Sequence, residues 1–312
     1  MSHESSTYDA VRRTSNNVAL VLGGGGAAGQ AWQIGVIAGL AEAGLDLIEA
    51  AELVIGTSSG STTAAWVRSG IPAAELFAKV LAEPSRPTRQ RPPSAQPNPV
   101  FERMRAIGAA ATSAAELRKA MGAYGLESDS AYGPEVTEQR RAMVAARLPN
   151  HEWSDRPLIV TAVNAQTGEL VAFDRDSGVD LVDAVTASTA LPGGGPTHNI
   201  NGTRYINGGV RSAENADLAA GYPNVIVLAP FGGRTGPLPE GQFEGIRRFP
   251  GADLPSHIEA LRDQGSHVEL ITPDPASLAA MGTNQMDPAT RLPTAQAGHT
   301  QGKQEALRIT LR

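Results

Sequence analysis

The sequence predicts one doubly wound α/β domain, and three observations support that fold class. The chain has 312 residues, which is enough for a full hydrophobic core. Apolar residues make up 41% of it and charged residues 19%, which is ordinary usage for a globular protein and excludes wholesale disorder. Short apolar runs also alternate with stretches of helical periodicity, which is the order of right-handed parallel βαβ units.

The first two strands and helices set this pattern. Residues 18–22 form a continuous apolar run followed by glycines, which is typical of a buried parallel strand. Apolar residues at helical spacing predict a helix over 29–43, which Gly44 ends. A second strand at 53–55 and a second helix at 61–68 follow.

The middle of the chain holds a long insertion. Residues 84–99 contain six prolines, so they form neither a helix nor a central strand, and helical character returns over 100–150. We expect either a surface insertion packed on the sheet or a mobile cover over a pocket. Further strands are predicted at 158–163, 170–173, 204–206, 225–228 and 268–271, and further helices at 181–190, 257–262 and 296–309. The chain is therefore divided into a disordered tail at 1–17 and one domain over 18–312.

Composition and charge exclude several classes of function. The net charge of −6 disfavours a nucleic-acid partner. Cysteine is absent, which excludes disulfides, thiolate metal sites and a cysteine nucleophile. The longest apolar stretch, 18–40, is interrupted by glycines and glutamines and is too broken to span a membrane. Residues 1–17 lack the apolar core of a signal peptide, so we expect a cytoplasmic protein.

A glycine-rich loop follows the first strand and opens the first helix. Its backbone N–H groups can surround an anion, and the helix N-terminus adds a favourable dipole. Gly24, Gly26 and Gly29 match the dinucleotide fingerprint, and the same N–H groups could equally form an oxyanion hole. A dinucleotide site expects an acid at the end of the second strand, but Glu52 stands before that strand. A tight turn is the remaining alternative, although four consecutive glycines exceed what a turn requires.

A candidate nucleophile follows the second strand. Residues 56–60 read Gly-Thr-Ser-Ser-Gly, which is the G-x-S-x-G elbow in its strand–turn–helix context. The glycines allow a sharp turn, and Ser58 projects its hydroxyl near the glycine-rich loop. A serine here could instead be a helix N-cap. The loop one βα unit earlier favours a nucleophile that attacks an acyl carbon while N–H groups hold the oxyanion.

A Ser-His-Asp hydrolase would also need a histidine as its base. His257 and His267 come late enough in the chain for the order found in α/β-hydrolases. Neither lies in a motif, and the elbow comes early for that fold. A histidine-based triad is therefore the less favoured alternative.

Three motifs in this order resemble those of bacterial patatin-like phospholipases. They are the glycine loop at 23–29, the elbow at 56–60 and a Gly-Gly pair at 208–209, and the resemblance extends over about 18–309. The runs 187–192, 205–212 and 215–218 also look like bacterial members. The resemblance implies a three-layer α/β/α sandwich with a mostly parallel central sheet. It also implies a Ser-Asp dyad that hydrolyses lipid acyl esters without histidine, metal or cofactor.

The resemblance assigns roles to individual residues. Ser58 is the expected nucleophile. The backbone N–H groups of Gly24, Gly25 and Gly26 are the expected oxyanion donors, and Gly29 completes the substrate-binding loop.

Two positions depart from the family pattern. The family's glycine loop usually carries Arg or Lys where this chain has Ala28, which removes a positive charge near the pocket. More seriously, Asn207 stands where the family has the Asp of the dyad. A neutral amide can hydrogen-bond to Ser58 but cannot accept its proton at pH 7. General-base help is typically worth roughly 10²–10⁴-fold in rate, so we expect impaired activity.

Four explanations of Asn207 remain open at this point. Asn207 is an engineered inactivating substitution, or the natural protein is a weak or binding-only member of the family. Otherwise a different carboxylate, Asp217 or Asp183, takes over as the base, or slow Asn-Gly deamidation regenerates an acid. Asp217 is alternatively expected to cap a helix or turn.

The expected substrate is a phospholipid or another acyl ester. It would bind in a pocket above Ser58, bordered by 84–99 and the glycine-containing loop 192–198. Such a substrate implies transient contact with a membrane surface, although no strongly basic amphipathic helix marks a docking site. The motifs specify neither head group, chain length nor oligomeric state.

Overall fold

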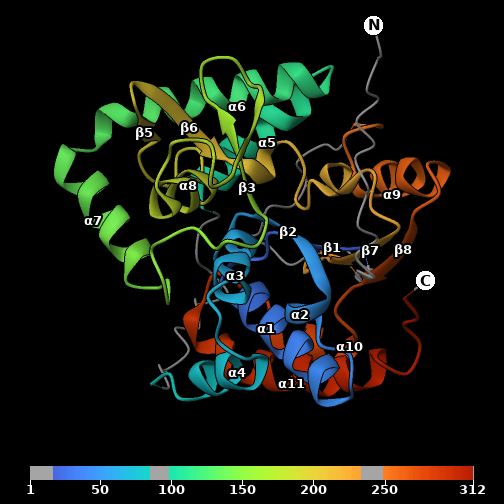
Figure 1. Cartoon of the computed structure of the whole chain (residues 1–312). Coiled ribbons are helices and arrows are strands. Elements are labelled where there is room, and N and C mark those ends of the chain that lie inside the picture. The colour runs from blue at the N-terminus through green and yellow to red at the C-terminus, as the bar shows by residue number, and fades with distance from the viewer. Residues whose placement is uncertain (1–16, 85–97, 233–248, 312) are drawn as a thin grey trace, which may run out of the picture.

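One sheet forms the centre of the structure, a computed structural model that describes residues 17–84, 98–232 and 249–311. Within those residues the sheet has eight strands (Figure 1). The strands are β1 Val18–Leu22, β2 Ala51–Thr57, β3 Leu158–Asn164, β4 Leu170–Phe173, β5 His198–Ile200, β6 Thr203–Asn207, β7 Asn224–Leu228 and β8 His267–Ile271. The short strand β5 is the one that the sequence pattern does not predict, because its three residues, His-Asn-Ile, form no apolar run.

The sheet is parallel at its centre and antiparallel at one end. Its order is β5-β6-β3-β2-β1-β7-β8, and β4 pairs with β3 outside that path. The strands from β3 to β8 along this path are parallel neighbours. The pairs β3–β4, β3–β6 and β5–β6 are antiparallel. The prediction of a mostly parallel sheet is confirmed.

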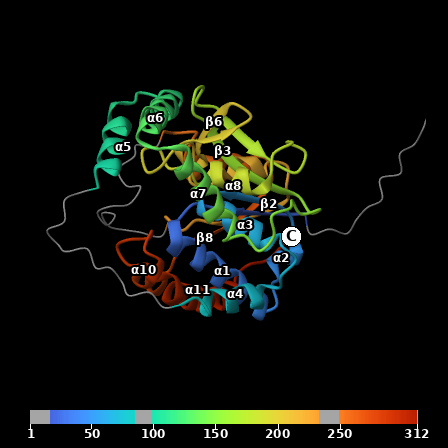
Figure 2. The same ribbon diagram turned by 90° about the vertical axis from the view of Figure 1, so that its left-hand side faces the viewer.

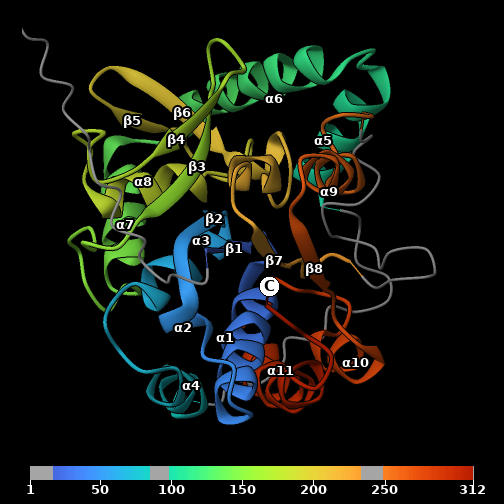
Figure 3. The same cartoon turned by 45° about the vertical axis from the view of Figure 1, so that its right-hand side comes forward.

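Helices cover both faces of this sheet (Figures 1 and 3). The α-helices are α1 Gly26–Glu42, α2 Leu47–Ala50, α3 Ser59–Val67, α4 Ala73–Leu81, α5 Pro99–Ala110, α6 Ala114–Ser128, α7 Pro134–Ala145, α8 Leu181–Ser188, α9 Leu254–Asp263, α10 Pro275–Met281 and α11 Arg291–Glu305. Short 3₁₀ turns lie at η1 Asp129–Ala131, η2 Gly208–Val210, η3 Ala216–Ala219 and η4 Pro288–Thr290. Within the described residues, no helix is both long and apolar enough to cross a membrane.

Strand β1 shows why the sequence produces three layers. Leu20 packs into the core that contains Trp32 of α1, whereas its neighbour Val21 packs into a second core with Leu261 of α9. Because both faces are covered, all five residues of β1 are buried. A strand buried on both faces needs apolar side chains at every position, so its sequence is continuously apolar rather than alternating.

The helices α5, α6 and α7 occupy the stretch where a helical cover is predicted (Figure 2). Met104 of α5 and Met121 of α6 share a third core with Ile206 of β6. The helical character expected over 100–150 is divided at Ser113, because its hydroxyl accepts the N–H of Glu116 and starts a new helix.

Two predicted segments lie outside the described residues. These are the tail at 1–17, apart from Asn17, and the proline-rich segment 84–99, apart from its ends.

Candidate active site

The candidate site lies where β2 and β6 end against each other along one edge of β3. Thr57, the last residue of β2, lies beside Thr161 of β3. Asn207, the last residue of β6, lies beside Ala162, which is the next residue of β3. Strand β4 pairs with the same two residues of β3 and so occupies the opposite edge. The side chain that follows β2, Ser58, therefore meets the side chain that ends β6.

Ser58 sits in a strained turn. Its φ of 55° and ψ of −126° place it in a region that side chains rarely adopt, at a cost of about 1–3 kcal/mol. The turn is fixed because the Ser58 N–H donates to the hydroxyl of Ser188 at 2.9 Å, and the Ser61 hydroxyl donates to the Ser58 carbonyl at 2.6 Å. A Cβ at Gly60 would lie 2.0 Å from the carbonyl oxygen of Leu22, so only glycine lets α3 start this close to β1. The half-buried Ser58 thus has the backbone geometry of a nucleophile elbow.

The Asn207 side chain lies against the Ser58 hydroxyl. Its Nδ2 donates to Ser58 Oγ at 3.0 Å, and its Oδ1 accepts the backbone N–H of Gly209 at 2.8 Å. The Gly209 N–H requires an acceptor, so the amide oxygen faces it and the NH₂ group faces Ser58. The Asn207 N–H is bonded to the carbonyl of Ala190 at 2.7 Å, and the residue is 2% exposed. Both ends of this amide are therefore fixed.

The direction of the Ser58–Asn207 hydrogen bond decides what the pair can do. The amide donates a hydrogen to Ser58 Oγ and offers no acceptor for the hydroxyl proton. A carboxylate in the same place could accept that proton with one oxygen. The Gly209 N–H on its other oxygen would favour the ionised form.

The glycine-rich loop lies directly beside the elbow. A Cβ at Gly24 would be 3.1 Å from Ser58 Cβ, so the loop and Ser58 are in contact. The N–H of Gly24 donates to the carbonyl of Ala213 at 2.8 Å. The N–H of Gly25 donates to the Ser59 hydroxyl at 2.8 Å. In this structure the N–H groups of Gly24 and Gly25 therefore already have acceptors within the protein, and their role as oxyanion donors stays a prediction.

Gly26 differs from its two predecessors. Its φ of +65° turns the chain into α1, and it is partly exposed whereas Gly24 and Gly25 are buried. In the part of the chain that the structure describes, its N–H has no acceptor. The N–H of Gly29, by contrast, bonds to the carbonyl of Gly25 at 2.9 Å, and so Gly29 stabilises the loop.

The two other carboxylates considered as bases are engaged elsewhere. Asp183 pairs with Arg141 at 2.7 Å and with His198 at 2.9 Å. Burial would raise the pKa of Asp183, but hydrogen bonds from Arg141 and His198 outweigh burial and lower it.

Asp217 is held in a similar way. It pairs with Arg211 at 2.6 Å and lies 3.4 Å from Nδ1 of His257. Burial would raise the pKa of Asp217, but the Arg211 hydrogen bond and the nearby His257 lower it. Among the described residues, neither Asp217 nor any histidine is hydrogen bonded to Ser58; His267 pairs with Glu269 instead.

Sequence reasoning missed Ser188 and Asn215. Ser188 accepts the Ser58 N–H, and the buried amide of Asn215 contacts the hydroxyl of Thr57 at 3.1 Å. Both residues lie in the runs 187–192 and 215–218 that resemble bacterial patatin-like proteins, so the signal was present without a role attached to it.

A guanidinium from another element lies near Ala28 but does not replace the positive charge that this position lacks. Ala28 is fully buried in the core. The guanidinium of Arg291 reaches the start of α1, where it donates to the carbonyl of Ala27 at 3.3 Å and to Gln30 at 2.7 Å. The same guanidinium pairs with Glu83 at 2.6 Å, so its charge is largely compensated.

The loop 192–198 beside the site is anchored to the helical cover. The Thr197 N–H and hydroxyl both donate to the Asp129 carboxylate, at 2.7 and 2.6 Å. The Tyr132 hydroxyl donates to the carbonyl of Gly193 at 3.3 Å. These contacts oppose the mobility that its glycines suggest.

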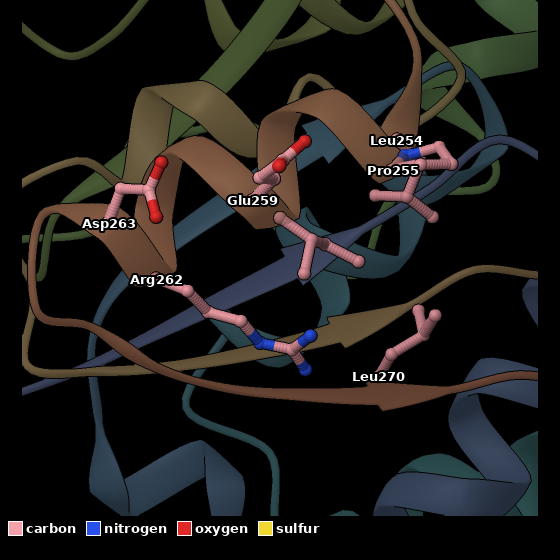
Figure 4. A pocket seen from close by; sticks show the side chains of 7 residues that line it. Leu254, Pro255, Glu259, Arg262, Asp263 and Leu270 are labelled. Atoms are coloured by element: carbon pink, nitrogen blue, oxygen red, sulfur yellow. The ribbon is translucent and has the colours of Figure 1, made fainter.

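A cavity of about 440 Å³ lies away from these residues, between α9 and β8 (Figure 4). It is lined by Leu254, Pro255, Ile258, Glu259, Arg262, Asp263 and Leu270, none of which is a predicted site residue.

The predicted substrate pocket above Ser58 stays a prediction, because its border 84–99 lies largely outside the described residues. Within the described residues, no group of three His, Asp or Glu side chains could hold a metal ion.

Comparison with known proteins gives one family match and two matches to solved structures. The family model of the patatin-like phospholipases matches residues 20–220. No curated protein matches the chain. Two solved structures also match the chain. The type III effector protein ExoU is 17% identical with a TM-score of 0.34, and 91% of this chain and 53% of that chain are covered. VipD from Legionella pneumophila is 13% identical with a TM-score of 0.39, and 93% of this chain and 66% of that chain are covered. The chain thus spans about half to two thirds of their lengths.

Proposed function

The chain belongs to the patatin-like phospholipase family, and on that premise we propose that it is a serine lipid acyl hydrolase in which Ser58 is the nucleophile. The observation that carries the proposal is the strained Ser58, whose Oγ lies 3.0 Å from the side chain of residue 207. The proposed substrate is a phospholipid or a related acyl ester, met through transient contact with a membrane surface.

The proposed reaction has two steps. Ser58 Oγ attacks the acyl carbon, the ester alcohol leaves, and water then hydrolyses the acyl-serine. We assign the oxyanion to the N–H of Gly26, which has no acceptor among the described residues, and to the N–H of Gly25 when the Ser59 hydroxyl rotates away from it. The N–H of Gly24 stays bonded to Ala213, so Gly24 serves by leaving room beside Ser58.

Proton transfer is the incomplete part of this reaction. In the family pattern the residue at position 207 takes the Ser58 proton, and Asn207 cannot do so. Because Asp183 and Asp217 form ion pairs with Arg141 and Arg211, they are poor candidates for the base that accepts the Ser58 proton. Deamidation requires the Asn207 side chain to turn toward the backbone nitrogen of Gly208, and its hydrogen bonds at both ends oppose that movement. These observations favour an engineered substitution or a naturally weak member over the other two explanations.

A second candidate function follows from the same hydrogen bond. Since the Asn207 amide donates to Ser58 Oγ, the pair is stable without any proton transfer. The alternative is a lipid-binding member of the family that holds an acyl lipid without turning it over.

Hydrolysis of p-nitrophenyl acyl esters separates the two candidates. The proteins to compare are the chain as written, Asn207→Asp, and Asn207→Asp combined with Ser58→Ala. We expect Asn207→Asp to raise kcat by roughly 10²–10⁴-fold, and Ser58→Ala to abolish that gain. Asn199→Asp is the matched control, because Asn199 is exposed in the preceding strand and also accepts a backbone N–H. If Asn207→Asp stays inert while phosphatidylcholine vesicles still bind the protein, the hydrolase proposal is wrong.

A further inference from the structure

A buried amide behind the candidate site touches the backbone and side chains on both sides of it. Asn215 is 0% exposed and lies at a left-handed backbone position, with φ of 53° and ψ of 43°. Few residues other than glycine adopt that conformation without strain, although asparagine is among them. A buried polar side chain at such a position needs every hydrogen bond to be made, so its partners are informative.

The Asn215 amide nitrogen lies close to four acceptors. Nδ2 is 2.8 Å from the Ser212 carbonyl and 3.1 Å from the Thr57 hydroxyl. It is also 3.3 Å from the Thr161 hydroxyl and 3.4 Å from the Gly208 carbonyl. The two hydroxyls are 2.8 Å apart and can bond to each other. Three separate segments of chain therefore converge on one NH₂ group.

Two of these partners are direct neighbours of the proposed catalytic pair. Thr57 precedes Ser58, and Gly208 follows Asn207. No β-ladder hydrogen bond joins the end of β2 to the end of β6, because both strands pair with β3 and not with each other. The Asn215 amide supplies a direct link across that junction.

The other end of the amide is fixed by charge. Asn215 Oδ1 accepts a hydrogen from the Arg211 guanidinium at 2.7 Å. That guanidinium is in turn held by the Asp217 carboxylate through bonds of 2.9 and 2.6 Å. The oxygen must face Arg211, so the NH₂ group must face the strand junction, and the amide cannot flip.

We propose that Asn215 is a positioning residue that holds Ser58 and residue 207 at hydrogen-bond distance, an inference whose kinetic consequence rests on the proposed hydrolase function. It acts through Thr57 and Gly208 and does not touch the substrate. A misplacement of about 1 Å can cost a catalytic group roughly 10²-fold in rate, so the link has a measurable effect.

The test replaces Asn215 by glycine in the Asn207→Asp background. Glycine keeps the left-handed backbone and removes the whole side chain, including the oxygen that accepts from Arg211. The matched control is Asn201→Gly, because Asn201 has a similar φ of 51° but is exposed in the β5–β6 turn. A fluorophosphonate carried to its end point counts the folded sites that contain a reactive Ser58.

We expect Asn215→Gly to lower kcat per titrated site by roughly 10- to 100-fold with little change in KM, and Asn201→Gly to leave both unchanged. A purely structural role would instead reduce the number of titrated sites and leave kcat per site intact, and that result would overturn the proposal. If Asn215→Gly does not fold, Asn215→Asp replaces it, since it keeps the shape and the Arg211 bond but loses the donors. The same fall in kcat per site is then expected.

Amide hydrogen exchange tests the positioning role of Asn215 without any enzyme activity, because it can be measured on variants of the chain that keep Asn207. Asn215→Gly should increase amide exchange in both 56–60 and 207–212, whereas Asn201→Gly should not. If Asn207→Asp proves inactive but this paired increase is seen, the positioning role stands and only the hydrolase proposal fails. If neither segment changes, Asn215 does not position the pair.

Discussion

The end of β2 and the end of β6 meet at one point of the molecule but contribute differently to it. The β2 end has a strained Ser58 backbone, a bonded Ser58 N–H and a glycine loop in contact with the side chain. The β6 end is also held by hydrogen bonds, yet its side chain is an amide that donates where the proposed reaction needs an acceptor.

This difference teaches that placement and proton transfer are separate properties of the site. Backbone register along β3 and buried hydrogen bonds bring residues 58 and 207 together. Those interactions depend little on whether the side-chain atom of residue 207 that faces Ser58 is nitrogen or oxygen. A site can therefore be complete in geometry and incomplete in chemistry.

Gly24→Val in the Asn207→Asp background should disturb the position of Ser58 more than any other change proposed here. A Cβ at position 24 would lie 3.1 Å from Ser58 Cβ, and the two valine methyl groups must displace the serine or the loop. We expect kcat to fall by more than about 10²-fold. The measurement is ester hydrolysis at a protein concentration corrected for the folded fraction.

Gly70→Ala is the control for Gly24→Val. Gly70 has a φ of +80° and no atom within 4 Å of its Cβ position, so alanine there adds backbone strain without a collision. A Gly24→Val enzyme as active as Gly70→Ala would show that the glycine loop does not constrain Ser58.

Ser188→Ala weakens the β2 end more gently. It leaves the half-buried Ser58 N–H without its acceptor, which costs about 0.5–1.5 kcal/mol in the free energy of unfolding. The strained turn can then relax, so we expect roughly tenfold lower kcat in the Asn207→Asp background. Denaturant unfolding and ester hydrolysis measure the two effects.

Thr186→Val is a matched control on the same helix. It removes a buried hydroxyl whose acceptor, in the part of the chain that the structure describes, is the carbonyl of Val182 in the same helix. Its unfolding free energy should fall less than that of Ser188→Ala, and its kcat should not change. Equal kcat for the two variants would show that the Ser188 hydroxyl does not hold the turn at Ser58.

The smallest expected effects concern the free energy of unfolding at acidic pH. Near each strand end, a buried histidine lies among charged side chains. His198 faces Asp183, Arg140 and Arg141 around α8, which carries Ser188. His257 faces Asp217, Arg211 and Asp253 behind the β6 end. Burial lowers the pKa of both histidines below 6.5, although the carboxylates beside them oppose the shift.

The sign of the pH effect follows from these shifts. A histidine whose folded pKa is lowered stabilises the fold above its unfolded pKa of 6.5 and loses that contribution as pH falls through the folded value. The lowered pKa values of Asp183 and Asp217 act in the same direction but from about pH 4 downward. We expect the unfolding free energy to decrease between pH 7.5 and 5.5, and to decrease less in His198→Gln and His257→Gln. An unchanged decrease in both variants would contradict the assignment.

The sequence predicts much of this site, because the two strand ends are marked by local motifs. The elbow at 56–60 and the strand before it follow from glycine spacing and a continuous apolar run. The contact between Ser58 and Asn207 could be expected only through the family resemblance, since β6 reaches β3 by an antiparallel pairing that no local pattern encodes.

The parts that sequence reasoning missed depend on long-range hydrogen bonds. The Gly24 N–H looks free in the sequence but is taken by Ala213, almost two hundred residues later. In the sequence, the run 215–218 looks like the start of a helix. The folded chain shows that the Asn215 amide lies at the junction of β2, β3 and η2.

The most direct test of the central claim is peptide mass spectrometry of Asn207→Asp, quenched during turnover of a long-chain p-nitrophenyl ester. The account predicts an acyl group on Ser58 in Asn207→Asp, and none in the same protein with Ser58→Ala. An Asn207→Asp enzyme that turns over the ester equally well with and without Ser58, and carries no acyl group at that residue, would contradict the claim that this strand junction is an acyl-transfer site.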